Sequence, residues 1–430
     1  MDIKLKKVKA ISGAVEVPAD KSITHRAVML SSIAEGDSVV RNYLPSDDCN
    51  RTIEAFRQMG AEIKIDNDNL RIKGAGLNLK KPQDCKYNIY AGNSGTTARL
   101  ISGILAGQNF ETIITGDESL SKRPMGRIIE PLSKMGAEIT SNKGFLPLTI
   151  KCKSSLKAVS YECDKSTAQV KSAVLFAGLY ADGATTYAEP VKSRDHSERM
   201  LKAFGADVRV NGNFVTIYPA QKLAPQDVTV PGDISSAAFF IAAALIVPDS
   251  NLTIKNVGVN PTRDGLIEVL KRMGADISLM NPREISNEPI CDIEVRYSKL
   301  KAVNVDASIV PRMVDEIPIF VLIATQAEGI TRISGAGELK VKETDRIFAV
   351  ASQFKKLGAQ VEALDDGFII NGNAGVPLNG NLLDSFEDHR IAMTLSIASL
   401  IADGETIIKD SNCVAISFPN FYEVLKNICK

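Results

Sequence analysis

The sequence has no feature that would take this protein to a membrane or a nucleic acid. Its longest apolar runs, such as residues 237–247, are shorter than the roughly 20 residues that span a bilayer. Fifty-one basic residues balance 51 acidic ones, so no net charge attracts the chain to nucleic acid or anionic lipid. The basic N-terminal segment lacks the apolar stretch of a signal peptide. We therefore expect no nucleic-acid or membrane partner.

Cysteine and histidine are present, but not in patterns that bind metals. The seven cysteines include no CxxC pair, and the three histidines are far apart in the sequence. This arrangement favours reduced, unpaired thiols and gives little support for a zinc site. We expect a cytoplasmic protein without a metal. Any anion that it binds must then be held by a local cluster of basic residues.

What the sequence does contain is one motif written five times. An amphipathic segment is followed by a glycine and an alternating apolar run, as in residues 57–63 and 271–277. The spacing of the apolar residues before the glycine is that of one helical face. The glycine stands where a helix C-cap favours a left-handed residue, and the run after it is typical of a strand. The five glycines are Gly60, Gly136, Gly205, Gly274 and Gly358.

A second element recurs in step with the first. Six times a small or polar residue opens an apolar helix that is followed by a turn and a β-rich run, as in residues 21–40 and 387–408. A sixth amphipathic helix, residues 418–428, ends the chain where its strand would follow. We therefore expect six α/β units of about 70 residues each. A chain of 430 residues can form two domains of three units, with a junction near residues 229–235.

Basic residues gather at the predicted starts of helices, where the positive end of the helix dipole disfavours them. Lys21 and Arg26 flank the start of the first apolar helix, and Lys342 and Arg346 open another. The same holds for five more basic residues: Arg123, Arg127, Lys171, Arg194 and Arg390. Several such cases predict helix N-termini that converge on anions. A network of surface ion pairs is the alternative interpretation.

Small and polar loops lie beside these cations. Residues 91–99 bring Gly92 and Gly95 to a helix start, where a ligand could approach the backbone closely. An ordinary N-cap turn is the alternative. Residues 164–172 offer hydroxyl and amide groups suited to a hydroxylated ligand.

Two acidic residues have a possible catalytic role. Asp315 stands just before a very apolar helix, either as its N-cap or as a base at the edge of a dry site. Glu343 stands between cations, either as an ion-pair partner or as a proton donor.

Taken together, these segments resemble the 5-enolpyruvylshikimate-3-phosphate synthase family of the shikimate pathway to aromatic amino acids. The resemblance covers essentially the whole chain, and its motifs fall in the family's order. The most specific are PADKSITHR (18–26), GNSGTTARL (92–100), KRPMGR (122–127), STAQVKSA (166–173), SRDHSE (193–198), KETDR (342–346) and DHRIAM (388–393).

The resemblance implies an α/β fold of two domains, an inside-out and barrel-like arrangement of six βαβαββ repeats with three per domain. It implies a discontinuous domain of residues 1–17 plus 232–430 and an inserted domain of residues 18–231. It also implies a monomeric enzyme without a cofactor. The family's enzymes transfer the enolpyruvyl group of phosphoenolpyruvate to the 5-hydroxyl of 3-phosphoshikimate and release phosphate. In this family the herbicide glyphosate occupies the phosphoenolpyruvate site, so we expect it to inhibit.

The family's functional residues carry over position by position. The resemblance assigns 3-phosphoshikimate to Lys21, Ser22, Arg26, Ser166, Thr167, Ala168, Gln169, Ser193, Arg194, Asp315 and Lys342. It assigns phosphoenolpyruvate to Lys21, Asn93, Gly95, Arg123, Gln169, Arg346 and Arg390. Asp315 would remove the hydroxyl proton and Glu343 would protonate the methylene carbon, with assistance from Lys21.

The chain departs from the family pattern at two further positions. Ile416 stands where many members have a lysine that contacts phosphoenolpyruvate, and Glu338 where many have an asparagine. Two alternatives remain open. The sister transferase that acts on UDP-N-acetylglucosamine normally carries a catalytic cysteine, which residues 107–124 lack. A non-catalytic repeat scaffold would not need Asp315, Glu343 and so many basic motifs.

Overall fold

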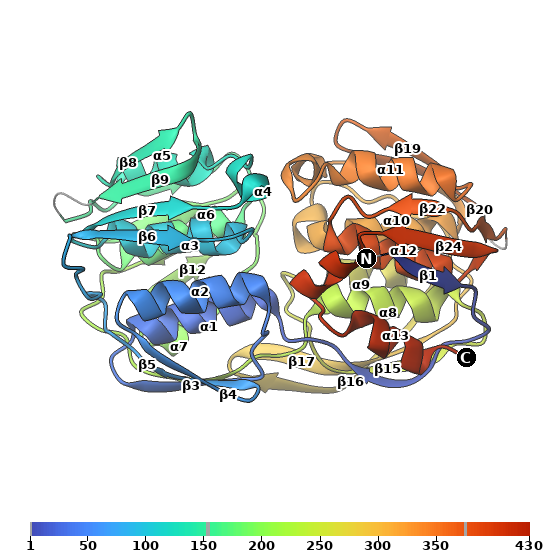
Figure 1. The fold of residues 1–430 in the computed structure, drawn as a ribbon, viewed down its shortest axis with the longest axis horizontal. Coiled ribbons are helices and arrows are strands. Elements are labelled where there is room, and N and C mark those ends of the chain that lie inside the picture. Colours follow the sequence, from blue (N-terminus) through green and yellow to red (C-terminus); the bar gives the residue numbers. More distant parts are fainter. Residues whose placement is uncertain (1, 152–154, 374–375) are drawn as a thin grey trace. The chain divides into compact units, whose positions relative to one another are not determined.

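A computed structural model describes residues 2–151, 155–373 and 376–430 of the chain (Figure 1). The chain forms two compact units. The inserted unit consists of Ala19–Val230 and Ile285–Glu288, and the discontinuous unit of Met1–Pro18, Pro231–Glu284 and Pro289–Lys430. The family resemblance predicted breaks at residues 17/18 and 231/232. It did not predict that Ile285–Glu288, the turn of a long hairpin, packs with the inserted unit.

The described residues of the inserted unit form three four-stranded sheets. Each sheet has one parallel pair of strands and then antiparallel strands, as the predicted βαβαββ repeat requires. Across the sheets the strands are β14 (Asp227–Thr229), β3 (Asp37–Arg41), β5 (Asn69–Lys73) and β4 (Glu62–Asp66); β6 (Lys86–Tyr90), β7 (Glu111–Thr115), β9 (Phe145–Lys151) and β8 (Glu138–Asn142); and β10 (Ser160–Glu162), β11 (Thr185–Ala188), β13 (Phe214–Ile217) and β12 (Val208–Asn211).

The sheets of the discontinuous unit vary more in their number of strands. Its described strands are β16 (Asp276–Ile285), β17 (Glu288–Arg296), β15 (Asn251–Gly258) and β2 (Ser12–Glu16); β18 (Glu328–Ile333), β20 (Gly367–Asn373) and β19 (Gln360–Leu364); β1 (Ile3–Lys6), β24 (Glu405–Lys409) and β22 (Leu382–Asp384); and the short pair β21 (Leu378–Asn379) and β23 (Ala402–Asp403).

Strands from distant parts of the chain complete three of these sheets. β14 pairs in parallel with β3 and serves as the first strand of the first repeat. β2 pairs in parallel with β15 and does the same for the fourth repeat. β1 pairs with β24. It occupies the sheet edge where the last strand of the sixth repeat would lie if a strand followed the final helix. The start of the chain therefore belongs to the discontinuous unit because its strands complete that unit's sheets.

Each repeat has one apolar helix packed inside its sheets (Figure 1). All 13 residues of α8 are buried, and a helix that is apolar on every side is stable only when other elements surround it. Contacts join α1 to α3 and α3 to α6 in one unit, and α8, α10 and α12 to one another in the other. These helices are α1 (Lys21–Ile33), α3 (Gly95–Ala106), α6 (Ala168–Gly178), α8 (Ile234–Ile246), α10 (Ile317–Thr325) and α12 (His389–Ser399). The predicted fold class is confirmed.

The second helix of a repeat ends at the recurrent glycine. All five glycines have φ between +83° and +103°, the left-handed region that glycine adopts without a steric penalty. The predicted C-caps are therefore confirmed, and a strand follows each. The helices are α2 (Asp47–Gln58), α5 (Gly126–Lys134), α7 (His196–Ala203), α9 (Gly265–Arg272), α11 (Arg346–Lys356) and, at the chain end, α13 (Phe421–Ile428). A short helix, α4 (Glu118–Ser121), was not predicted.

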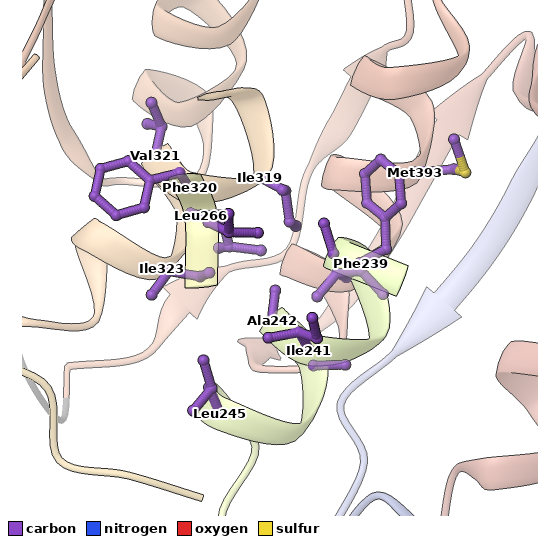
Figure 2. Packing of buried hydrophobic residues seen from close by; sticks show 14 of the residues in the cluster. Phe239, Ile241, Ala242, Leu245, Leu266, Ile319, Phe320, Val321, Ile323 and Met393 are labelled. Atoms are coloured by element: carbon purple, nitrogen blue, oxygen red, sulfur yellow. The ribbon is translucent and has the colours of Figure 1, made fainter. Parts of the chain in front are cut away.

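The core of the discontinuous unit lies where the apolar helices meet. Figure 2 shows Phe239 and Leu245 of α8 close to Ile319 and Ile323 of α10. All four side chains are at most 2% exposed. Burial of a side chain of this size stabilises the fold by roughly 1.5–3 kcal/mol. The helix starts are thus held by a dry core, and the polar residues described next project from those starts.

Candidate active site

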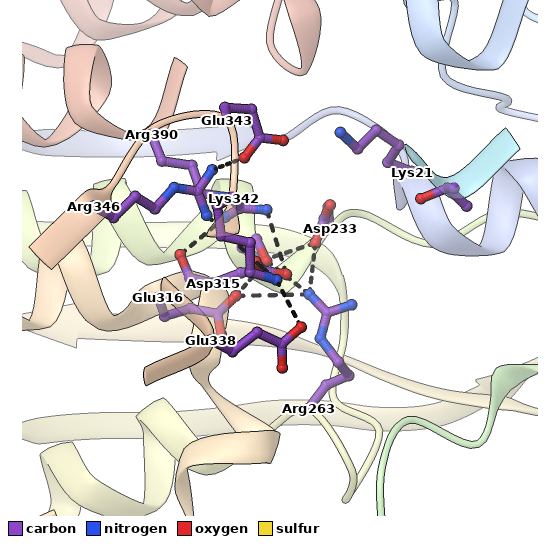
Figure 3. A network of polar contacts seen from close by, with 12 residues as sticks. Lys21, Asp233, Arg263, Asp315, Glu316, Glu338, Lys342, Glu343, Arg346 and Arg390 are labelled. Carbon is purple, nitrogen blue, oxygen red and sulfur yellow. Dashed lines mark hydrogen bonds and ion pairs between the residues drawn. The ribbon is translucent and has the colours of Figure 1, made fainter. Parts of the chain in front are cut away.

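Asp315 lies in a short 3-10 turn, η2 (Val314–Glu316), immediately before α10. Its carboxylate faces Lys342 Nζ at 3.7 Å, Arg346 Nη1 at 3.6 Å and Arg390 Nη2 at 3.8 Å (Figure 3). The N-cap position of α10 belongs to Glu316, whose side chain makes no capping hydrogen bond. The N-cap interpretation of Asp315 is therefore wrong. Its carboxylate lies in a cluster of cations.

Arg346, the first residue of α11, is the centre of that cluster and is only 1% exposed. Its Nε donates to Asp388 at 2.8 Å and its Nη2 to Glu343 at 2.7 Å. Burial alone would lower the pKa of Arg346, but the carboxylates of Asp388, Glu343 and Asp315 raise its pKa above the usual range. Nη1 has no hydrogen-bond partner among the described residues. The anionic group that faces Nη1 is the Asp315 carboxylate, at 3.6 Å.

Lys342 and Arg390 complete the cationic side of the cluster. Lys342 Nζ lies 3.5 Å from Glu338, so the residue that replaces the family's asparagine supplies a second carboxylate to this lysine. Arg390, in the first turn of α12, donates from Nη1 to the backbone oxygen of Asp315 at 3.2 Å. Ile416, which stands at the family's lysine position, ends the 3-10 helix η4 (Ser411–Ile416) and contributes no charge.

In the inserted unit, the cations predicted at the start of α1 are held by polar partners. Lys21 is the first residue of the helix, and its Nζ lies 3.0 Å from Asp48 Oδ2. Asp48 was not predicted, because it comes from α2, and an acidic residue near a helix start is common.

Arg26 is buried where three helices meet. Its guanidinium donates to Ser197 Oγ of α7 at 2.7 Å, to Ser172 Oγ of α6 at 2.8 Å and to the Ser22 backbone oxygen of α1 at 2.9 Å. Burial lowers the pKa of Arg26 to about 10, although Glu198 opposes this shift. The side chain therefore stays charged at neutral pH. Two of its three partners were not predicted, since they depend on how α6 and α7 pack.

The predicted loop at the start of α6 contains Ser166, Thr167, Ala168 and Gln169. Ser166 Oγ accepts a hydrogen bond from Val191 N at 3.0 Å and donates to Val191 O. Thr167 takes the N-cap position without a capping bond from its side chain, and Ala168 opens the helix. Gln169 accepts from Arg99 at 2.9 Å and donates to Thr96 at 3.2 Å. The structure thus connects this loop to the start of α3 through Arg99, which was not predicted.

Ser193 is held by a buried charge triad. Glu189 accepts hydrogen bonds from Ser193 N at 2.9 Å and Ser193 Oγ at 2.6 Å. The side chain of Lys171 is 0% exposed and lies 2.8 Å from Glu189 and 2.9 Å from Glu198. Burial alone would lower the pKa of Lys171, but Glu198 and Glu189 raise it above the usual value. Arg194 follows Ser193 directly in the chain, and its positive charge lowers the pKa of Arg26.

We expect the Lys171→Met variant to lose about 3–5 kcal/mol of unfolding free energy, because it leaves two buried carboxylates without their cation. Urea-induced unfolding measures this loss. Lys151→Met is the control, because Lys151 pairs with Glu111 while its own side chain is 49% exposed. It should change stability far less. If both variants unfold at the same urea concentration, the triad does not stabilise the fold.

Asn93, Gly95 and Arg123 come together at the start of α3. Arg123 Nη1 donates to the Asn93 backbone oxygen at 3.3 Å and Nη2 to Asn93 Oδ1 at 2.5 Å. Asn93 Nδ2 donates to Asp117 at 2.8 Å. A Cβ atom built on Gly95 would lie 2.8 Å from Arg99 Nη1 and 3.7 Å from Arg123 Nη1. The glycine therefore borders the space in front of two guanidinium groups.

Among the described residues, no group of three or more His, Cys, Asp or Glu side chains could hold a metal ion. In the same part of the chain, no helix is long and apolar enough to cross a membrane. Each unit gathers lysine and arginine side chains with carboxylates and hydroxyls at the starts of buried helices. The fold and these clusters define an α/β enzyme acting on small anionic substrates.

Comparison with known proteins identifies the family. Residues 5–425 match the family model of EPSP synthase (3-phosphoshikimate 1-carboxyvinyltransferase). The chain is 77% identical over 430 residues to the 3-phosphoshikimate 1-carboxyvinyltransferase of Endomicrobium trichonymphae, with 100% of both chains covered. The chain belongs to the EPSP synthase family. The predicted family and transferase activity in the shikimate pathway are thereby confirmed.

Solved structures agree with this assignment. EPSP synthase from Acinetobacter baumannii superimposes with a TM-score of 0.88 at 43% identity, covering 100% of this chain and 98% of that one. The enolpyruvyl transferase NikO from Streptomyces tendae has a TM-score of 0.80 at 18% identity, covering 99% of this chain and 96% of that one, and shows the fold alone.

Proposed function

We propose that this chain transfers the enolpyruvyl group of phosphoenolpyruvate to the 5-hydroxyl of 3-phosphoshikimate, using the residues that its motifs predict. The observation that carries the proposal is the cluster around Asp315, in which one carboxylate faces three cations within 3.8 Å. A cluster of this kind can bind an anionic substrate and accept a proton beside it. Both substrates carry a phosphate and a carboxylate, which accounts for clustered cations in a chain without net charge.

In this proposal 3-phosphoshikimate is held chiefly by the inserted unit. Arg26 supplies a fixed guanidinium, since three hydrogen bonds already orient it. The hydroxyls of Ser22, Ser166, Thr167 and Ser193 surround the shikimate moiety, with Ala168 N, Gln169, Arg194 and Lys21. The hydroxyl protons of Ser166 and Ser193 are donated to Val191 O and Glu189 in the structure. They must therefore turn toward the substrate phosphate when it binds. Lys342 and Asp315 act on the same substrate.

Phosphoenolpyruvate is held by the arginines Arg123, Arg346 and Arg390, with Asn93, Gly95, Gln169 and Lys21. Paired N–H groups of an arginine match the geometry of a phosphate or a carboxylate. Arg346 contributes the Nη1 group that has no hydrogen-bond partner among the described residues. The side chains also stabilise charge that develops on the departing phosphate.

Proton transfer is divided between two carboxylates. Asp315 takes the proton of the 5-hydroxyl, and Glu343 delivers one to the methylene carbon of phosphoenolpyruvate, assisted by Lys21. Glu343 is ion-paired with Arg346 at 2.7 Å, which stabilises its carboxylate form. Glu343 must therefore take up a proton from solvent before it can donate one, and an anionic substrate that takes up the charge of Arg346 favours this uptake.

A crystal structure with 3-phosphoshikimate tests these assignments. The proposal predicts its carboxylate or phosphate within hydrogen-bond distance of Arg26 and Ser193, and its 5-hydroxyl facing Asp315. A ligand that leaves the Ser193–Glu189 hydrogen bond intact and touches none of these groups would contradict the assignment.

We also propose that the two units act as the predicted domains and close on the substrates, because the proposed binding and catalytic residues come from both units. Closure would exclude water from the reacting groups. Small-angle X-ray scattering is expected to give a smaller radius of gyration with 3-phosphoshikimate plus a phosphoenolpyruvate-site inhibitor than with either omitted. A radius that stays constant under saturating ligand would argue against closure.

The enzyme is further proposed to act as a cytoplasmic monomer, without nucleic-acid or membrane partners. Support comes from the balanced charge and from the free cysteines Cys49, Cys85, Cys163, Cys291, Cys413 and Cys429. Size-exclusion chromatography with light scattering tests the monomer. The two alternative functions, the UDP-N-acetylglucosamine transferase and the non-catalytic repeat scaffold, lack such support. Residues 107–124 contain no cysteine, and the family match is to EPSP synthase.

A further inference from the structure

We propose that Arg263 and Glu316 are positioning residues for Asp315, fixing the direction of its carboxylate and balancing the charge behind it. This inference rests on the proposed role of Asp315 as the base. Asp315 and Glu316 are neighbours in the turn η2. Figure 3 shows their side chains taking different partners, Asp315 among Lys342, Arg346 and Arg390, and Glu316 beside Arg263.

The contacts of Glu316 fasten the turn to the start of α8. Its side chain is 0% exposed and lies 3.6 Å from Arg263 Nη2. Its Oε1 also accepts a hydrogen bond from Ser235 Oγ. Arg263 Nη2 donates to Ser235 Oγ at 2.7 Å and lies 3.3 Å from Asp233, the N-cap residue of α8. Because Glu316 is anchored in this way, rotation of the turn that carries Asp315 is restricted.

Stability alone does not explain this cluster. Taking Arg263 and Glu316 out of water has a desolvation cost, and apolar residues of similar size often serve a fold equally well or better than a buried ion pair. Glu316 Oε2 is buried without a hydrogen-bond partner among the described residues, which adds to that cost. The residue directly before it is the proposed base. A buried charge pair at this place is therefore better explained by its effect on Asp315.

The electrostatic effect has a definite sign. Asp315 faces Lys342, Arg346 of α11 and Arg390 of α12 on one side. Lys342 is in turn paired with Glu338, and Arg346 with Glu343 and Asp388. The buried His389 stands next to Arg390 in α12. On the other side stand Glu316, Arg263 and Asp233. A negative charge near Asp315 favours its protonated form and a positive charge its ionised form.

We expect Glu316→Gln and Arg263→Gln each to lower kcat about tenfold, with the KM of both substrates nearly unchanged, because a misdirected base slows chemistry more than binding. Their pH profiles should differ. The acid-side midpoint of kcat should move to lower pH in Glu316→Gln, which removes a negative charge. It should move to higher pH in Arg263→Gln, which removes a positive one. Arg263→Lys should restore the midpoint. If one of the two buried variants unfolds, the other still tests its own predicted shift against the native enzyme and Arg263→Lys.

Arg312→Gln is the matched control. Arg312 stands three residues before Asp315, but its partners are Asp264 at the start of α9 and Glu268 within it. It should leave the acid-side midpoint in place. Opposite shifts for Glu316→Gln and Arg263→Gln support the inference. Shifts in the same direction, or none, overturn it while leaving the role of Asp315 intact. Full turnover in Asp315→Asn overturns both.

Discussion

The Asp315→Asn enzyme is expected to have a kcat at least about 10²-fold below that of the native chain, the usual scale for losing a positioned acid–base group. The amide keeps the shape of the carboxylate, but it cannot accept the proton of the 5-hydroxyl. None of the cations Lys342, Arg346 and Arg390 is removed. Binding of 3-phosphoshikimate, measured by calorimetry, should therefore remain close to native. Steady-state kinetics gives kcat.

Asp306→Asn is the control for this variant. Asp306 lies in the same connection before α10 and is exposed, and its carboxylate accepts hydrogen bonds from Ser308 N and Ser308 Oγ. It should retain native kcat. Near-native turnover in Asp315→Asn would return Asp315 to the role of an ion-pair partner and remove the base from the proposed mechanism.

The second large effect is expected at Gly95, on the response to glyphosate. We expect glyphosate to inhibit the native enzyme in competition with phosphoenolpyruvate. In Gly95→Ala, the inhibition constant should rise about tenfold or more relative to the KM for phosphoenolpyruvate, because an added methyl group in a tight space costs about 1–3 kcal/mol. The new methyl would lie 2.8 Å from Arg99 Nη1. Glyphosate has the longer chain and loses more from that methyl than the substrate does.

The backbone conformation at Gly95 does not interfere with this comparison. Gly95 is the first residue of α3 and does not have a left-handed φ, so alanine can adopt its conformation. Gly126 also opens a helix, α5, and a Cβ there would meet no atom within 4 Å. Gly126→Ala should leave both constants unchanged. An equal rise of both constants in Gly95→Ala would mean that the methyl hinders the two ligands alike.

The fold was predictable where it depends on local pattern. Six repeats were identified from the helical spacing before a glycine and from an apolar helix in step with it. This was possible because helix capping and burial depend on residues that are close together in the sequence. Non-local pairing was not predictable in this way. Nothing in residues 227–229 shows that they complete the sheet of β3, and nothing in the turn Ile285–Glu288 shows that it packs with the inserted unit.

The same distinction holds for the site. Lys21, Arg26, Asp315 and Arg346 stood out as charges at helix starts or by their family motifs. Their partners did not, because Asp48, Ser197 and Asp388 are ordinary residue types whose roles depend on tertiary packing. The N-cap interpretation of Asp315 was excluded only by the structure, in which Glu316 takes the cap position, and its role as the base stays a prediction. Glu316 and Arg263 carried no sequence pattern at all.

Phosphate release is the most direct test of the central claim. Purified enzyme is given phosphoenolpyruvate with 3-phosphoshikimate, with UDP-N-acetylglucosamine, or alone, and the phosphate and the enolpyruvyl product are quantified together. We expect one phosphate per enolpyruvyl product with 3-phosphoshikimate, and none in the other two reactions. Phosphate release with the nucleotide sugar, or no release with 3-phosphoshikimate, would contradict the account.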